Sequence, residues 1–126
     1  MLPTAARPAR ILVVEDDIAI RQTLAELLAD EGFEVACASN GAEALDHLSC
    51  SVAPSLILLD LAMPVMDGWK FRSAQREDPR FARIPTVVVS ASHSADRRCV
   101  EELAPDAFLA KPFDLDSLMS TIHRLC

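Results

Sequence analysis

Short apolar runs in this sequence end repeatedly in hydrophilic residues whose types could do chemistry. RILVV leads into the acidic triplet Glu15–Asp17, and LILL leads into Asp60. A run of valines then ends at Ser90, and the run AFLA leads into Lys111. A lone carboxylate after four large apolar residues is costly to bury unless another group pairs with it. We therefore expect the rest of the chain to bring such groups to Asp60.

Carboxylates, a lysine and a serine gathered at one place suit the metal-assisted transfer of a phosphoryl group. Oxygen ligands without His or Cys select a hard ion, so we expect Mg²⁺, with Mn²⁺ or Ca²⁺ as alternatives. A Mg²⁺ ion held by few carboxylates keeps positions open for phosphate oxygens. Lys111 and Ser90 add donors for a phosphoryl group. Asp60 is then the expected nucleophile, because a carboxylate can form an aspartyl phosphate.

The apolar patterns also predict the elements that must position these residues. Strand-like runs alternate with helix-like stretches, which is typical of an α/β protein with a doubly wound, five-stranded parallel sheet and five helices. Runs such as LVV, LILL and TVVV are apolar without alternation, as a sheet covered on both faces requires. The predicted strands are residues 10–15, 33–38, 56–60, 84–90 and 106–110. Helices are expected after each of them, the fourth at roughly 95–103.

The carboxyl ends of parallel strands meet at one edge of the sheet, where ligands bind. With the strand order 2-1-3-4-5, Asp16 and Asp60 end adjacent strands that lie about 4.8 Å apart. Ser90 ends the strand on the other side of Asp60. Lys111 is two strands from Asp60, roughly 10 Å by the same spacing, most of which a lysine side chain can cover. This order therefore brings all four residues to one site.

Length and composition restrict the class of protein. The 126 residues suit one domain, residues 10–126, after a flexible N-terminal tail at 1–9. A net charge of −7 argues against direct binding of nucleic acid, which needs a basic face. No apolar run approaches the ~20 residues of a membrane span. Four cysteines without metal-site spacing suggest a reducing, cytoplasmic location.

The motifs that contain these residues resemble the receiver domain of two-component response regulators. They are ILVVEDD, the block DLAMPVMDG that begins at Asp60, the strand IPTVVVSA and the tripeptide that begins at Lys111. Four such motifs in the same order along nearly the whole chain are highly specific. The resemblance implies a flavodoxin-like, CheY-like fold.

The resemblance also implies a role for each residue. Asp60 would accept a phosphoryl group from a histidine kinase or a histidine phosphotransfer protein. Asp16 would bind Mg²⁺ directly and Glu15 through water, and the backbone carbonyl of Ala62 would be a further metal ligand. Ser90 would bind the phosphoryl oxygens, and Lys111 would neutralise one of them.

Phe108 occupies the position of a switch aromatic residue, where Tyr is common in the family. Phosphorylation would draw Ser90 inward, let Phe108 follow, and change the face built from the fourth helix, fifth strand and fifth helix, to which an unknown effector would bind. A static core role is the alternative for Phe108. Glu15 also departs from the family pattern, since Asp is frequent there.

Each site residue has a simpler structural interpretation as well. Asp60 would then only cap the turn that follows it, and the triplet Glu15–Asp17 would only complement a helix dipole, which we expect to be the whole role of Asp17. Ser90 would be an ordinary strand-end hydroxyl and Lys111 a solvated surface residue.

Two other classes of protein compete with a signalling receiver, which is not an enzyme beyond its own phosphorylation and dephosphorylation. A haloacid-dehalogenase-type phosphatase also forms an aspartyl phosphate, but Ala62 replaces the second Asp that such enzymes use as general acid. The other class is a degenerate receiver that only binds partners, and the complete acid set argues against it. The sequence does not decide between a stand-alone receiver and part of a larger regulator or hybrid kinase.

Overall fold

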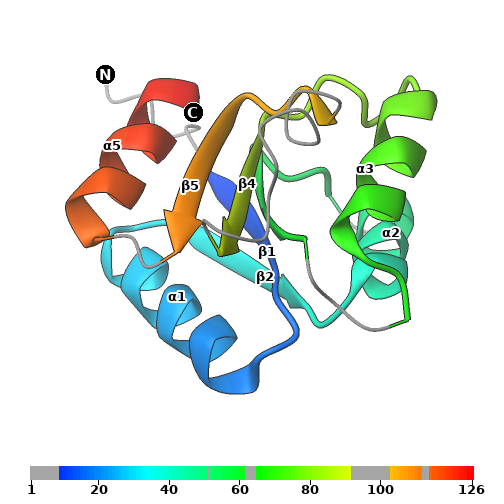
Figure 1. The fold of residues 1–126 in the computed structure, drawn as a ribbon. Helices are drawn as coiled ribbons and strands as arrows, with labels where there is room; N and C mark the ends of the chain where they lie inside the picture. Colours follow the sequence, from blue (N-terminus) through cyan, green and yellow to red (C-terminus); the bar gives the residue numbers. More distant parts are fainter. Residues whose placement is uncertain (1–8, 51, 62–64, 92–102, 112–113) are drawn as a thin grey trace, which may run out of the picture.

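The computed structural model describes residues 9–50, 52–61, 65–91, 103–111 and 114–126, the side chains of Ala91 and Lys111 excepted. Its five strands are all parallel and lie in the order β2-β1-β3-β4-β5 (Figure 1). This confirms the predicted doubly wound sheet and its strand order. The strands are β1 (Arg10–Val14), β2 (Glu34–Ala38), β3 (Leu56–Asp60), β4 (Thr86–Ala91) and β5 (Ala107–Lys111).

Four helices lie within the described residues: α1 (Ile18–Asp30), α2 (Gly41–Cys50), α3 (Gly68–Glu77) and α5 (Leu115–Leu125). Helices α1 and α5 cover one face of the sheet, and α2 and α3 cover the other (Figure 1). The fourth predicted helix, at roughly 95–103, lies outside the described residues except for Leu103. Residues 1–8 of the predicted tail lie outside them too, and the carbonyl oxygen of Ala9 accepts a hydrogen bond from the backbone N–H of Glu34.

Each face of the sheet has its own apolar core. Side chains that alternate along β1 and β3 point to opposite faces, so Leu12 and Ile57 belong to the core under α2 and α3, whereas Ile11 and Leu58 belong to the core under α1 and α5. All five side chains of β3 are buried. Each large apolar side chain buried in this way contributes about 1.5–3 kcal/mol. The LILL run that precedes Asp60 is thus the centre of the sheet.

Asp residues begin three of the helices. Asp17, Asp67 and Asp114 accept hydrogen bonds from backbone N–H groups three residues later, at 3.0, 2.9 and 2.6 Å. These bonds satisfy N–H groups that the first helical turn leaves without a partner in the helix. The helix-terminus role predicted for Asp17 is confirmed.

Four of the five strands differ by one or two residues from the predicted bounds: β1 ends at Val14 rather than at residue 15, and β2 begins at Glu34 rather than at residue 33. β4 begins at Thr86 rather than at residue 84, because Pro85 has no backbone N–H to give to a ladder. β5 begins at Ala107 rather than at residue 106, and the carboxylate of Asp106 accepts the Thr86 N–H at 2.7 Å at the start of β4. Both strands also extend one residue further than expected, so that Lys111 is the last residue of β5.

Candidate functional site

The register of the sheet brings the predicted site residues to one edge. Val14 pairs with Leu59, so the next residue on each strand, Glu15 and Asp60, come side by side. On the other side of β3, Asp60 pairs with Val89, and Ser90 follows immediately. Ala91 pairs with Lys111 at the end of β5. Residues far apart in sequence therefore converge as the strand order predicts.

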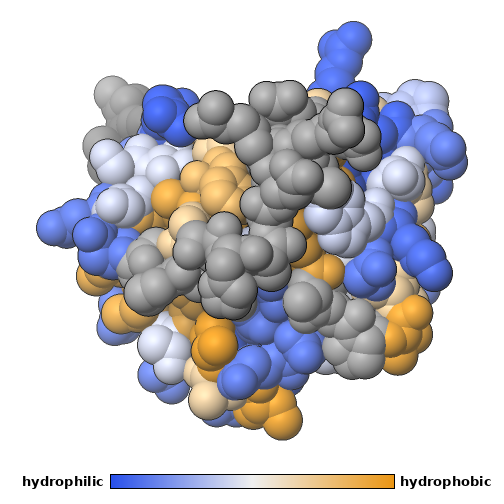
Figure 2. Space-filling model, in the orientation of Figure 1, coloured by the Kyte–Doolittle hydropathy of each residue, from blue (hydrophilic) through white to orange (hydrophobic). Residues whose placement is uncertain are grey.

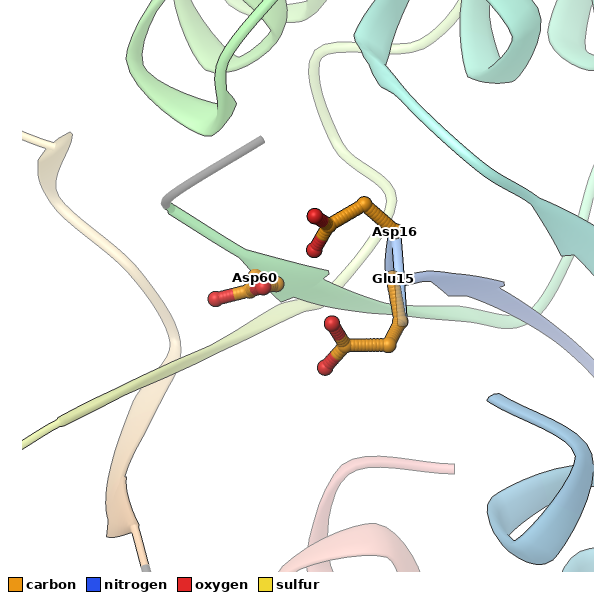
Figure 3. Close-up of side chains that lie close together, drawn as sticks. All are labelled: Glu15, Asp16 and Asp60. Atoms are coloured by element: carbon orange, nitrogen blue, oxygen red, sulfur yellow. The ribbon is translucent and has the colours of Figure 1, made fainter. Parts of the chain in front are cut away.

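Three carboxylates form the centre of this edge. One carboxylate oxygen from each of Glu15, Asp16 and Asp60 lies within 4.8 Å of the other two. Figure 3 shows Glu15 and Asp16 reaching from the end of β1 towards Asp60 at the end of β3. Glu15 and Asp60 are buried, with 3% and 5% of their surfaces exposed, whereas Asp16 is exposed. The cluster is thus anchored in the protein and open on one side.

The donor set fits a hard divalent cation. Three carboxylates at this separation repel one another unless a positive charge lies between them. Their ligand atoms are all oxygens, which Mg²⁺ prefers, and the exposed side at Asp16 leaves room for water or phosphate oxygens to complete the shell. Glu15, Asp16 and Asp60 are therefore the residues that would hold such an ion, and it would supply charge neutralisation for a phosphoryl group.

The turn after β1 holds its own carboxylates in place. The backbone N–H of Asp17 donates to Oε2 of Glu15 at 3.2 Å, and the Asp17 carboxylate in turn caps α1. The backbone N–H of Glu15 donates to the carbonyl oxygen of Ala38 at 3.0 Å, which ties the turn to the end of β2. The three acids of the triplet thus have different roles: Glu15 and Asp16 face Asp60, and Asp17 caps helix α1.

Gly68 allows helix α3 to begin directly against Asp60. A Cβ atom at this position would lie 2.5 Å from the carbonyl oxygen of Asp60 and 2.8 Å from the Cα atom of Leu61. The Gly68 N–H donates to the Leu61 carbonyl oxygen at 3.0 Å. Because both close contacts are with backbone, no side-chain rotation could make room for a Cβ atom. This explains why the apolar run that ends in Asp60 is followed by Asp67-Gly68.

The remaining predicted site residues are described to different extents. Ser90 is buried, with 5% of its surface exposed, one residue past the strand partner of Asp60. Phe108 is half-buried and packs against the core under α2 and α3. Ala62 lies outside the described residues, and so does the side chain of Lys111.

Two arginines that make structural hydrogen bonds at the edges of the sheet are not predicted from the sequence. Arg21 on α1 donates from Nη1 to the carbonyl oxygen of Glu15 at 2.8 Å and to that of Asp16 at 3.4 Å. Arg72 on α3 is buried at the opposite edge of the sheet, where it binds Gln75 and Thr86. The only signal for Arg21 is its position one helical turn after Asp17, and a polar residue on a helix ordinarily indicates an exposed face.

Residues 11–123 match the family of response regulator receiver domains. The response regulator Rre1 of Synechocystis is 38% identical over 122 residues, which are 95% of this chain and 52% of Rre1. The regulatory protein AtoC of Escherichia coli is 38% identical over 117 residues, 91% of this chain and 24% of AtoC. The chain thus spans about half of the length of Rre1 and about a quarter of that of AtoC.

Solved structures agree with this match. The chemotaxis response regulator CheY4 of Vibrio cholerae superimposes with a TM-score of 0.85 and 31% identity, covering 94% of this chain and 99% of CheY4. The response regulator TrrA of Thermotoga maritima, solved in complex with Mg²⁺ and BeF, gives a TM-score of 0.82 and 31% identity over 94% of this chain and 99% of TrrA. Fold and acidic site together define a receiver of two-component signalling. The chain belongs to the response regulator receiver domain family.

Proposed function

We propose that this domain stores a signal as a phosphoryl group on Asp60, received in a Mg²⁺-dependent reaction from a histidine kinase or a histidine phosphotransfer protein. The observation that carries the proposal is the convergence of the Glu15, Asp16 and Asp60 carboxylates within 4.8 Å at the carboxyl edge of the sheet. Family membership supports the same chemistry, since the relatives are response regulators.

The residues would divide the reaction between them. A carboxylate oxygen of Asp60 forms a bond to phosphorus as the bond from phosphorus to the donor's imidazole nitrogen breaks, and the electron pair leaves with the imidazole. Glu15 and Asp16 would hold the cation, which would supply positive charge opposite the phosphoryl oxygens. Ser90 and Lys111 donate to those oxygens, consistent with their places at the ends of β4 and β5. The carbonyl of Ala62 is proposed as a further metal ligand.

The proposed output is a population shift of the face that includes β5 and α5. Ser90 moves towards the phosphoryl group and Phe108 follows it, from its half-buried position against the core. In this proposal Phe108→Ala is phosphorylated normally but binds an effector protein less well. Equal effector binding by phosphorylated wild type and Phe108→Ala would instead support a static core role.

An apolar surface beside the acidic cluster is our candidate contact for the protein phosphodonor. Ile18 follows the acidic triplet directly and is 60% exposed, and Ile20 is 39% exposed. Between α1 and α5 lies a groove of about 310 Å³, lined by Ile20, Leu24 and Leu115 among others. Figure 2 shows hydrophobic patches at the lower left, where Figure 1 places α1 and the start of α5. Ile18→Asp should therefore slow transfer from a protein donor but not from acetyl phosphate.

We also propose a cytoplasmic location and no turnover of external substrates. Within the described part of the chain, no helix is long and apolar enough to cross a membrane. The response regulator relatives support the same location. Sustained hydrolysis of p-nitrophenyl phosphate would contradict the non-enzymatic assignment.

The decisive test of this function is phosphorylation by a small donor. Incubation with acetyl phosphate and Mg²⁺ should add a single phosphoryl group of ~80 Da to wild type, as expected of an aspartyl phosphate. The gain should be absent when Mg²⁺ is chelated and absent in Asp60→Asn. An unmodified wild-type mass, with Mg²⁺ present and the fold intact by circular dichroism, would contradict the proposal.

A further inference from the structure

Arg21 is joined to the turn that carries the metal-binding carboxylates, although it is not itself an acid of the site. Its Nη1 atom donates to the Glu15 carbonyl oxygen at 2.8 Å, within the ordinary range of a strong hydrogen bond, and makes a longer contact of 3.4 Å with the Asp16 carbonyl oxygen. Arg21 is half-buried on the first turns of α1. One guanidinium group thus contacts the peptide groups of both Glu15 and Asp16.

The Arg21 contact completes a set of bonds that fix this turn. The Glu15 N–H is held by Ala38 of β2, and the Glu15 side chain accepts from the Asp17 N–H. Asp17 is held by its own cap bond to Ile20. Arg21 adds the bond to the Glu15 carbonyl oxygen, so that the peptide groups on both sides of Glu15 have defined partners. Asp16, whose side chain is exposed, points towards Asp60 from this same turn (Figure 3).

The directions of the carboxylates affect how tightly a cation binds. Three carboxylates have to stay within a few ångströms of one another against their mutual repulsion. Neighbouring groups that orient metal ligands typically affect metal affinity ten- to a hundred-fold, because a ligand that must be reordered on binding costs free energy. Arginine suits such a role, since its charge is permanent and its planar donors hold a fixed geometry.

We propose that Arg21 is a positioning residue of the cation site: by holding the Glu15 and Asp16 peptide groups it keeps both carboxylates directed at Asp60. The inference rests on the proposed function of the site. It predicts that the loss of the guanidinium weakens Mg²⁺ binding while the chemical step at saturating Mg²⁺ is unchanged. If Arg21 only stabilised α1, its replacement would lower the unfolding temperature but leave the Mg²⁺ affinity of the folded protein unchanged.

The test compares Arg21→Met and Arg21→Lys with wild type by calorimetric titration with Mg²⁺ alone, and by phosphorylation from acetyl phosphate at several Mg²⁺ concentrations. Arg21→Met retains the aliphatic stem, and we expect its dissociation constant for Mg²⁺ to rise about tenfold, with a normal phosphorylation rate at saturation. Arg21→Lys retains a charge but not the planar group, so its dissociation constant for Mg²⁺ should lie between those of wild type and Arg21→Met. It also provides the test if Arg21→Met does not fold. Arg80→Met is the matched control, because Arg80 is an exposed arginine at the far edge of the sheet, where it pairs with Asp78 and lies over the ring of Phe81.

Three outcomes would overturn the positioning role of Arg21. Equal Mg²⁺ affinity in folded wild type and both Arg21 variants would overturn the positioning role and leave the proposed function standing. A lower phosphorylation rate that saturating Mg²⁺ does not restore would also overturn it, since Arg21 would then act on the chemical step. Absence of Mg²⁺ binding by wild type would overturn this inference together with the proposed cation site.

Discussion

The two edges of the sheet treat polar groups in opposite ways. At the carboxyl edge, like charges from Glu15, Asp16 and Asp60 are brought within 4.8 Å of one another. At the opposite edge, Arg72, Gln75 and Thr86 are buried and bind one another. One edge gathers groups that repel and favour an added cation, and the other gathers groups that satisfy each other. The groups suited to binding a cation and the groups that stabilise the fold therefore lie at opposite ends of the strands.

Arg72 is the centre of the stabilising edge. Its Nε atom donates to the Leu103 carbonyl oxygen at 2.9 Å and its Nη2 atom to that of Ala104 at 2.6 Å. Ala104 has a φ of 47°, in the left-handed region that costs a non-glycine residue free energy, and the bond helps to hold it there. Burial lowers the pKa of Arg72, an effect that nearby Asp106 opposes. Within the described residues, every buried side-chain nitrogen and oxygen has a hydrogen-bond partner.

Removal of Arg72 should have the largest effect on stability. Arg72→Met leaves the partner carbonyls and the Gln75 and Thr86 side chains without their charged donor, which we expect to lower the free energy of unfolding by about 3 kcal/mol. Urea unfolding measures this difference, with Arg80→Met as control for loss of a surface arginine. Phosphorylation of the folded fraction should persist. A loss below about 0.5 kcal/mol would show that the network contributes little.

Gly68→Ala should disturb the carboxyl edge itself. A methyl group gains at most about 1 kcal/mol in helix propensity, but it would lie 2.5 Å from the backbone of Asp60, and overpacking costs about 1–3 kcal/mol. We expect a net loss of about 1–2 kcal/mol together with slower phosphorylation. Ser73→Ala, at an exposed position of the same helix, is the control. Stability and rate equal to wild type would mean that α3 does not need its close approach to β3.

Asp16→Asn tests the repulsion at the carboxyl edge. Without Mg²⁺ the variant should be more stable than wild type by about 0.5 kcal/mol, because one of three neighbouring charges is gone. Saturating Mg²⁺ should stabilise wild type by binding the folded state and raise the unfolding temperature of the variant much less. Thermal unfolding with and without Mg²⁺ measures both effects. An equal Mg²⁺-induced increase in the two proteins would remove Asp16 from the ligand set.

The smallest effect is expected at the start of α5, which belongs to neither edge network. The Ser117 backbone N–H and hydroxyl lower the pKa of Asp114, so its charged form is favoured in the folded state. The stabilisation is present above the unfolded pKa of about 3.9 and is lost as pH falls through the folded value. Asp114→Ala should therefore be less stable than wild type at neutral pH, with the difference shrinking in acid. Urea unfolding of both proteins at several pH values measures this difference.

The carboxyl edge could be predicted from sequence because its signals are local. An acid directly after LILL, or directly after RILVV, marks a strand end, and parallel strands bring such ends together. Asp60, Glu15 and Asp16 follow from that pattern together with the assumed strand order 2-1-3-4-5, which the structure confirms. Ser90 follows from the same reasoning.

The opposite edge could not be predicted, because its partners are distant in sequence and are backbone groups. Arg72 looks like an exposed helix residue until the carbonyls of Leu103 and Ala104 accept its hydrogen bonds. Gln75 looks exposed too, until the carbonyls of Phe81 and Ile84 do the same. Arg21 escapes for the same reason, since carbonyl oxygens leave no trace in residue types. Ile20 shows the opposite error. Its spacing from Leu24 and Leu28 predicts a buried residue, yet it is exposed and lines the groove between α1 and α5.

The most direct test of the central claim locates the phosphoryl group. Wild type treated with acetyl phosphate and Mg²⁺ is reduced with borohydride, which converts an acyl phosphate to an alcohol, and is then digested and sequenced by mass spectrometry. The account predicts homoserine at position 60 and unmodified Asp at positions 16 and 17. A reduced side chain at another Asp or Glu, with Asp60 intact, would contradict it.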